Sequence, residues 1–191
     1  RLLVQQGIQA EFMAALKERV GNLKVGHPLD PETEVGPVVS RAHFQKVMSY
    51  MEIAQADGAT TAVGGRAMEE LGAGNYICPT LFTEADNSMR VSREEIFGPV
   101  LTAMSFETEE DAVNMANDTP YGLACSIWTE DLTRAHRVAP QIEAGILWVN
   151  SWFLRDLRTP FGGAKQSGIG REGGTYSLEF YTEMSNVCVK L

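Results

Sequence analysis

Strand-like and helix-like segments alternate along most of this 191-residue chain. From Ile8 to Leu23, apolar residues recur at spacings of three and four, which places them on one face of a helix. The same periodicity returns at 41–57, 107–116 and 132–138, and strand composition is found at 61–63, 77–85, 100–106, 123–128 and 145–150. Because the strand segments are mostly apolar, the alternation predicts an α/β fold with a parallel sheet covered by helices on both faces.

Two residues mark the limits of the second helical segment. Ser40 precedes its first apolar position and is predicted to be the N-cap, because a hydroxyl oxygen can accept a bond from a free N–H of the first turn. Gly58 follows the last apolar position and is predicted to end the helix. Ligands of parallel sheets bind beyond the carboxyl ends of the strands, so the loop after Asn150 is where a site is expected.

Charge and cysteine content narrow the class of protein. The chain has 16 Lys and Arg against 25 Asp and Glu, a formal charge of −9, which disfavours a nucleic-acid partner. Cys78, Cys125 and Cys188 are odd in number, and their spacing fits no metal site with the histidines. We interpret them as small buried hydrophobic residues of a protein in a reducing, cytoplasmic compartment. No apolar run approaches the roughly 20 residues that cross a bilayer, so no membrane partner is expected.

Three glycines near the end of the chain, Gly168, Gly170 and Gly173, have the G-x-G-x-x-G spacing of a dinucleotide-binding turn. The context contradicts that function, because the preceding residues TPFGGAKQS are too polar and too rich in glycine for a strand. Only 18 residues follow Gly173, so the acidic ribose ligand expected about 20 residues further on falls beyond the chain. We expect the glycines instead to permit a tight backbone crossing through left-handed conformations.

Several motifs in order resemble the aldehyde dehydrogenase superfamily. They are EEIFGPV at 94–100, YGLA at 121–124, WVN at 148–150, and PFGG at 160–163 with the following Lys165, Ser167, Gly168, Gly170, Arg171 and Glu172. The resemblance extends over essentially all 191 residues and implies NAD-dependent oxidation of an aldehyde to an acid. In that family a Cys attacks the carbonyl and a Glu activates water, and both are expected to lie upstream of Arg1. The chain is therefore expected to be a C-terminal part that is inactive alone.

The resemblance also implies an organisation. Residues 1–165 are expected to form an α/β catalytic domain that is incomplete at its N-terminus. Residues 166–191 are expected to contain the glycine-rich crossing, a short helix and an oligomerisation strand. That strand, Val187–Leu191, would pair with another subunit in a homodimer or homotetramer.

Within the superfamily, the stretch from Asn150 to Gly174 followed by SLEFYTE is similar to the 2-hydroxymuconic semialdehyde dehydrogenases of bacterial aromatic-ring degradation. Two alternatives stay open. The first is a dehydrogenase for another acidic semialdehyde, of the 2-aminomuconic or succinic type. The second is a non-catalytic module that self-associates through its terminal strand.

The resemblance assigns cofactor roles to two residues of the first motif. Glu95 matches the carboxylate that accepts hydrogen bonds from the nicotinamide ribose, and Phe97 matches the aromatic residue beside the nicotinamide ring. A carboxylate can accept from two hydroxyls at once, which suits a ribose. The alternative is that Glu94 and Glu95 only charge a helical turn that begins at Ser92.

Substrate contacts are expected in the loop 152–158. Arg155 and Arg158 stand where enzymes for neutral aldehydes carry uncharged side chains, and a guanidinium could hold the distal carboxylate of a semialdehyde in bidentate fashion. Arg158 is the favoured one of the two. Trp152 and Phe161 would wall the substrate chain. The alternative is a surface ion pair between Asp156 and one of the arginines.

Overall fold

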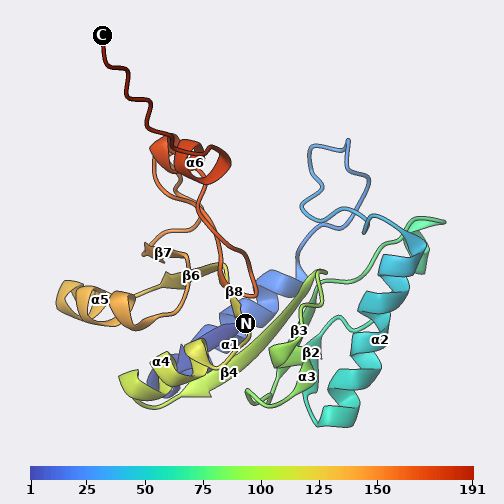
Figure 1. Cartoon of the computed structure of the whole chain (residues 1–191). Helices are drawn as coiled ribbons and strands as arrows, with labels where there is room; N and C mark the ends of the chain where they lie inside the picture. Colours follow the sequence, from blue (N-terminus) through green and yellow to red (C-terminus); the bar gives the residue numbers. More distant parts are fainter. The chain divides into compact units, whose positions relative to one another are not determined.

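The computed structural model describes all 191 residues, which divide into two compact units, Arg1–Ala112 and Val113–Leu191. The first unit contains a four-stranded sheet with the order β1-β4-β3-β2 (Figure 1). Strand β4 runs parallel to both β1 and β3, whereas β2 lies antiparallel at the edge beside β3. The strands are β1 (Leu2–Gln5), β2 (Thr60–Val63), β3 (Thr80–Thr83) and β4 (Val100–Phe106).

Helices cover both faces of this sheet, as the alternating pattern predicts. Helix α1 spans Gln9–Gly21 and helix α2 spans Arg41–Asp57. Leu81 of β3 belongs to the core with Met13 of α1, and the next residue, Phe82, belongs to the core with Phe44 of α2. Because successive side chains of a strand point to opposite faces, α1 and α2 lie on opposite sides of β3.

Helix α2 begins and ends where the sequence predicts. The Ser40 hydroxyl accepts a hydrogen bond from the backbone N–H of His43 at 3.2 Å, as an N-cap does. Gly58 closes the helix with a φ of 96°, a left-handed conformation that glycine adopts without steric cost. One face of the helix is buried through Phe44, Val47, Tyr50 and Ala54.

Short elements connect the strands of the first unit. Between β3 and β4 the chain forms the four-residue helix α3 and then an irregular turn, Glu94–Gly98, that leads into Pro99 and β4. The short elements are η1 (Gln6–Ile8), η2 (Glu69–Leu71) and α3 (Arg90–Arg93). The turn carries the first sequence motif and lies between α3, in which Val91 and Ser92 are buried, and β4, which is buried at its centre.

The second unit contains two small sheets. Strand β6 pairs with β7 in parallel, and β5 pairs with β8 in antiparallel fashion. Helix α5 matches the predicted helix 132–138 at both ends, whereas the pairing of β5 with β8 is not predicted from the sequence. The elements are α4 (Glu109–Asn117), which crosses from the first unit, β5 (Tyr121–Gly122), β6 (Ala124–Ile127), α5 (Leu132–Val138), η3 (Ala139–Gln141), β7 (Ile146–Val149), β8 (Ala164–Lys165) and α6 (Gly174–Tyr181).

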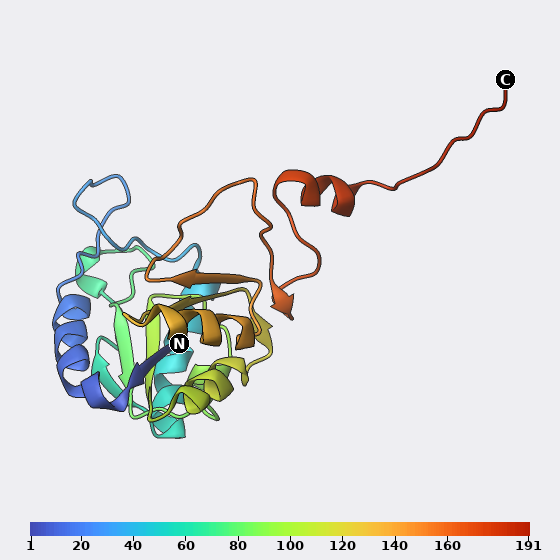
Figure 2. The same ribbon diagram turned by 90° about the vertical axis from the view of Figure 1, so that its left-hand side faces the viewer.

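The chain after α6 has no assigned secondary structure and runs as an extended segment (Figure 2). Its residues are exposed, including the apolar Val187, Val189 and Leu191. The pairing of this segment with another subunit therefore stays a prediction. None of the helices has the length and apolar character that a membrane span requires.

Candidate functional site

The turn Glu94–Gly98 presents the two residues predicted to contact a cofactor. Ile96 is buried in the core beneath α2, and its neighbours Glu95 and Phe97 are both exposed. Phe97 has 73% of its surface exposed, which is unusual for a phenylalanine. A buried residue thus anchors the turn, and an acid and an aromatic ring are exposed on either side of it.

Phe97 has a strained backbone. Its φ is 59°, in the left-handed region that costs a non-glycine residue about 1–3 kcal/mol. Two side chains of α2 hold the turn in this conformation. The imidazole Nε2 of His43 lies 2.6 Å from the Phe97 carbonyl oxygen, and the Lys46 ammonium donates to the Glu95 carbonyl oxygen at 3.0 Å. Strain that surrounding contacts maintain is a frequent feature of functional sites.

The two glutamates of the turn have different surroundings. The carboxylate of Glu94 accepts hydrogen bonds from Arg90 at 2.8 and 3.0 Å and from the Tyr50 hydroxyl at 2.7 Å. These donors, Arg90 first, hold the pKa of the Glu94 carboxyl below its usual value. No hydrogen bond or ion pair engages the Glu95 carboxylate, and the Glu95 carbonyl oxygen accepts a hydrogen bond from Lys46 of α2. The Glu94 carboxylate is therefore occupied by partners within the fold, whereas both oxygens of the Glu95 carboxylate are available to accept hydrogen bonds.

The loop after β7 carries the predicted substrate residues of the second unit. The Trp148 indole donates to the Leu154 carbonyl oxygen at 2.8 Å, and its ring lies 5.1 Å from that of Trp152 between centroids. Asn150 at the end of β7 has a φ of 50°, and its amide exchanges two hydrogen bonds with the backbone of Thr129. Trp152 thus contacts Trp148 near the end of the strand, while 66% of its own surface stays exposed.

Arg155 is held by neighbours from the glycine-rich crossing. Its guanidinium donates to the Glu172 carboxylate at 2.9 Å and lies over the ring of Phe161, with Cζ 3.9 Å from the centroid. Only 28% of the Arg155 side chain is exposed. Phe161 and Glu172 are themselves joined by two backbone hydrogen bonds of 2.8 Å. Arg155 is therefore built into the connection between the loop and the crossing.

Arg158 has a more open setting. Its guanidinium binds both oxygens of Asp156, from Nε at 2.9 and 3.1 Å, and 87% of the side chain is exposed. The side-chain and then the backbone hydrogen bonds from Arg158 lower the pKa of the Asp156 carboxyl. This is the surface ion pair that the sequence leaves open as an alternative. An exposed pair of this kind contributes only about 0–1 kcal/mol, so an incoming carboxylate can replace Asp156 at small cost.

The glycine-rich crossing has the conformation predicted from its sequence. Gly170 and Gly173 have φ values of 69° and 98°, and a side chain at Gly173 would meet the Thr159 carbonyl oxygen. Two cations tie the crossing to its neighbours, since Arg171 donates to the carbonyl oxygens of Gly163 and Gly170, and Lys165 to those of Asn117 and Thr119. The left-handed glycines agree with the expected backbone crossing, and its structural function stays a prediction.

The cysteines are less buried than predicted. Cys78 and Cys125 are half-buried, and Cys188 is exposed in the extended terminal segment. The interpretation as buried hydrophobic residues is therefore wrong for Cys188, because a lone terminal segment has no core to cover it. No group of three or more His, Cys, Asp or Glu residues in the structure could hold a metal ion.

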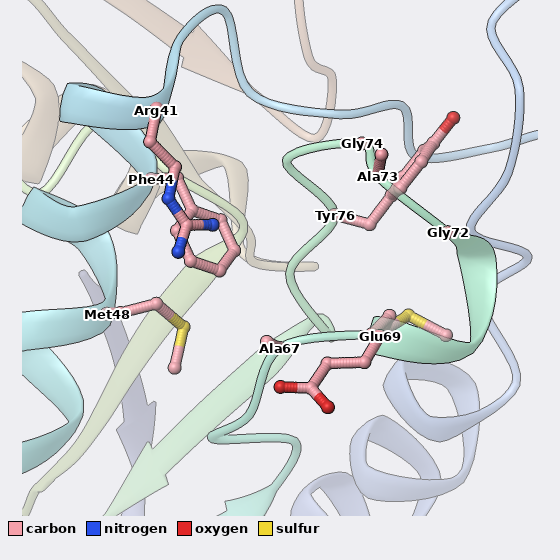
Figure 3. A pocket seen from close by; sticks show the side chains of 10 residues that line it. Arg41, Phe44, Met48, Ala67, Glu69, Gly72, Ala73, Gly74 and Tyr76 are labelled. Carbon is pink, nitrogen blue, oxygen red and sulfur yellow. The ribbon is translucent and has the colours of Figure 1, made fainter.

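A cavity of about 350 Å³ that the sequence does not predict lies in the first unit. Figure 3 shows Arg41, Phe44 and Met48 of α2 on one side and the chain that carries Glu69 and Tyr76 on the other. The Arg41 guanidinium lies over the Phe44 ring, 4.6 Å from its centroid. Neither Glu95 nor Phe97 lines this cavity, so it is distinct from the turn.

This arrangement is an α/β fold in which an exposed acid and an exposed aromatic residue share one strained turn. The profile of the aldehyde dehydrogenase family matches residues 1–187, and the chain belongs to this family. It is 55% identical over its whole length to a 2-hydroxymuconic semialdehyde dehydrogenase of Pseudomonas sp. strain CF600, of which it covers 40%. It is 46% identical over 99% of its length to a betaine aldehyde dehydrogenase of Cereibacter sphaeroides, of which it covers 39%.

Solved structures agree with this assignment. The chain superposes on HpcC from Thermus thermophilus with a TM-score of 0.93 and 46% identity, covering 100% of this chain and 40% of that one. A betaine aldehyde dehydrogenase from Staphylococcus aureus, solved in complex with NAD+, gives a TM-score of 0.91 at 46% identity, covering 94% and 36%. The chain thus spans about two fifths of the length of the relatives that it matches.

Proposed function

We propose that these 191 residues are the C-terminal part of an NAD-dependent aldehyde dehydrogenase, called the complete enzyme below. Its proposed substrate is 2-hydroxymuconic semialdehyde or a closely related semialdehyde that carries a carboxylate. Support comes from the identity of 55% with a 2-hydroxymuconic semialdehyde dehydrogenase, against 46% with a betaine aldehyde dehydrogenase. Betaine aldehyde is cationic, so the higher identity favours an acidic substrate.

Glu95 and Phe97 are proposed to receive the nicotinamide half of NAD. The residues suit the group, because an exposed carboxylate without an ion pair can accept from both ribose hydroxyls. The exposed Phe97 ring offers an apolar surface that orients the nicotinamide without competing for its amide. NAD, when bound, supplies the hydride acceptor. The observation that carries this proposal is that both side chains are exposed on one strained turn. His43 and Lys46 of α2 hold the backbone of this turn by hydrogen bonds.

The loop after β7 is proposed to supply the substrate wall. Arg158 would exchange Asp156 for the distal carboxylate of the substrate, since its fork can bind either in bidentate fashion. Trp152 and Phe161 would line the apolar chain, and Arg155 would add positive charge from behind Phe161. A pocket with apolar walls and one charged end matches a conjugated chain that ends in a carboxylate.

The nucleophilic Cys and the general-base Glu are proposed to belong to residues outside these 191. Cys78 donates its backbone N–H to the Arg66 carbonyl oxygen at the entry to β3, and Cys188 lies in the exposed terminal segment. Three free cysteines suit a reducing, cytoplasmic compartment. The exposed apolar residues of 187–191 are proposed to pair with another subunit in a homodimer or homotetramer.

One experiment tests the proposal directly. The complete enzyme is expected to reduce NAD with 2-hydroxymuconic semialdehyde, and Glu95→Gln is expected to weaken NAD binding about tenfold, because an amide accepts less strongly than a carboxylate. Titration calorimetry with NAD measures the binding. The 191-residue chain assayed alone is expected to be inactive, and turnover by it would show that its nucleophile lies among these residues.

A second acidic semialdehyde stays as an alternative. The chain is 50% identical over its whole length to a 2-aminomuconic 6-semialdehyde dehydrogenase of Pseudomonas. This identity is close to the 55% found with the 2-hydroxymuconic semialdehyde dehydrogenase. An arginine recognises a carboxylate without specifying the carbon chain that carries it. Comparison of kcat/KM for the 2-hydroxymuconic, 2-aminomuconic and succinic semialdehydes separates the three candidates. Equal kcat/KM values for all three would show that the pocket is not specific for a muconic semialdehyde.

A further inference from the structure

The turn that presents Glu95 and Phe97 is fixed from one side by helix α2. His43 and Lys46 stand three residues apart, and therefore share one face of the helix. His43 bonds to the carbonyl oxygen of Phe97, and Lys46 bonds to the carbonyl oxygen of Glu95. The two bonds hold the main chain immediately on both sides of Ile96, whose side chain is buried in the same core as α2.

The bond from His43 has a defined polarity. A carbonyl oxygen can only accept, so Nε2 of His43 must carry the hydrogen. That hydrogen is present in the neutral tautomer protonated at Nε2 and also in the imidazolium. The His43 ring also meets the Phe97 ring edge-on, at 5.9 Å between centroids and 77° between planes.

We propose that His43 and Lys46 are positioning residues that hold this turn in the geometry that receives the cofactor. The inference rests on the proposed function of Glu95 and Phe97. Without these bonds, the left-handed backbone of Phe97 would relax toward more favourable φ values and carry the ring away from the Glu95 carboxylate. Fixing the turn in advance reduces the ordering cost of binding, which is the general effect of preorganisation.

A purely structural role for the two bonds would have a different signature. Helix α2 is anchored independently by Phe44, Val47, Tyr50 and Ala54 in the core and by the Ser40 cap. The bonds from His43 and Lys46 lie at exposed positions, where the loss of one changes global stability little. Removing them is therefore expected to change cofactor binding much more than thermal unfolding.

The test uses pairs of variants of the complete enzyme. His43→Phe keeps a ring and removes the donor, whereas His43→Gln restores a donor of similar reach. Lys46→Met and Lys46→Arg form the matching pair. Each variant without a donor is expected to raise the Kd for NAD about fivefold, the equivalent of one lost hydrogen bond, with KM for NAD raised and kcat changed less. His43→Gln and Lys46→Arg are expected to recover most of the affinity.

Gln45→Ala is the matched control, because Gln45 is exposed on the same helix between the two positioning residues. It is expected to leave the Kd for NAD unchanged. Glu95→Gln, tested in parallel, separates the two levels of the proposal. If Glu95→Gln leaves NAD binding unchanged, the proposed function of the turn is wrong. If Glu95→Gln weakens binding but His43→Phe and Lys46→Met do not, the function stands and the positioning role is overturned.

Discussion

The guanidinium of Arg155 lies over the ring of Phe161, with 3.9 Å between Cζ and the ring centroid, and it also donates to Glu172 at 2.9 Å. A planar guanidinium is suited to both contacts at once, since it stacks through its face and donates through its edge. The positive charge of Arg155 is thus already paired with the Phe161 ring and the Glu172 carboxylate. The Arg158 guanidinium, three residues on, forms an ion pair with the neighbouring Asp156 and is largely exposed. The two arginines are expected to respond differently to substitution.

Arg155→Ala is expected to destabilise the complete enzyme by about 1–2 kcal/mol, the sum of a partly buried cation–π contact and an ion pair. Because the loop then loses its attachment to the crossing, KM is expected to rise for acidic and neutral aldehydes alike. Chemical denaturation and kinetics with both classes measure the two effects. Arg155→Lys, which keeps the charge without the planar fork, is expected to be intermediate. Unchanged stability with a loss confined to acidic aldehydes would instead make Arg155 the direct ligand of the carboxylate.

Arg158→Ala is expected to leave stability almost unchanged, because an exposed pair contributes only about 0–1 kcal/mol. KM for carboxylate-bearing aldehydes is expected to rise about tenfold or more, the range of a hydrogen bond to a charged group, while KM for neutral aldehydes stays the same. Steady-state kinetics with one substrate of each class provide the measurement. An equal rise in KM for both classes of aldehyde would show that Arg158 does not bind the substrate carboxylate.

Asp156→Asn tests the same site in the opposite direction. The variant keeps the side-chain oxygen that accepts from the backbone N–H of Arg158 at 2.9 Å, but it removes the charge that competes with the substrate. Release of an exposed ion pair is expected to lower KM for acidic aldehydes by up to about fivefold. The double variant of Asp156→Asn with Arg158→Ala is the control, and it is expected to show no such gain. A rise in KM would mean that Asp156 orients Arg158 rather than competing for it.

The sequence predicts most of the architecture because its helices carry local signals. Ser40 and Gly58 mark the ends of α2, and helix 132–138 is found at its predicted bounds. The antiparallel placement of β2 is missed, since it depends on which strand lies beside it and not on its own composition. The two-residue strands β5 and β8 are too short to have a pattern of their own.

The candidate site is predicted only in part. The motif at 94–100 identifies Glu95 and Phe97, but nothing in it indicates His43 or Lys46, which precede it by about 50 residues and meet it only in the fold. The sequence alone assigns His43 no function. Likewise, the composition of loop 152–158 shows two arginines, and only the pairing with Glu172, 17 residues further on, distinguishes Arg155 from Arg158. Contacts between segments that are distant in the chain are therefore the feature that a single sequence predicts least well.

The Glu94 carboxylate gives the turn a pH dependence. Hydrogen bonds from Arg90 and Tyr50 lower its pKa in the folded state. A lowered folded pKa means that the stabilisation is present above the unfolded pKa of about 4.3 and is lost as the pH falls through the folded pKa. The stability difference between the parent and Glu94→Gln is therefore expected to be constant from about pH 6 to 8 and to shrink below about pH 4. Urea denaturation across this pH range measures the stability difference. A difference that grows on acidification would mean that the pKa of Glu94 is not lowered in the folded state.

Gly173 tests whether the glycine-rich crossing is structural. Its φ is 98°, and an added Cβ would overlap the Thr159 carbonyl oxygen, a backbone atom that no rotamer change can move away. Gly173→Ala is expected to destabilise the complete enzyme by more than about 2 kcal/mol, because backbone strain and a steric clash act together. Gly7→Ala is the matched control, since nothing lies within 4 Å of the added methyl group there and its φ is not positive. Thermal unfolding of the two variants provides the comparison. If Gly173→Ala kept its stability and lost only NAD affinity, the crossing would have to be treated as a nucleotide-binding turn after all, and its structural interpretation would be wrong.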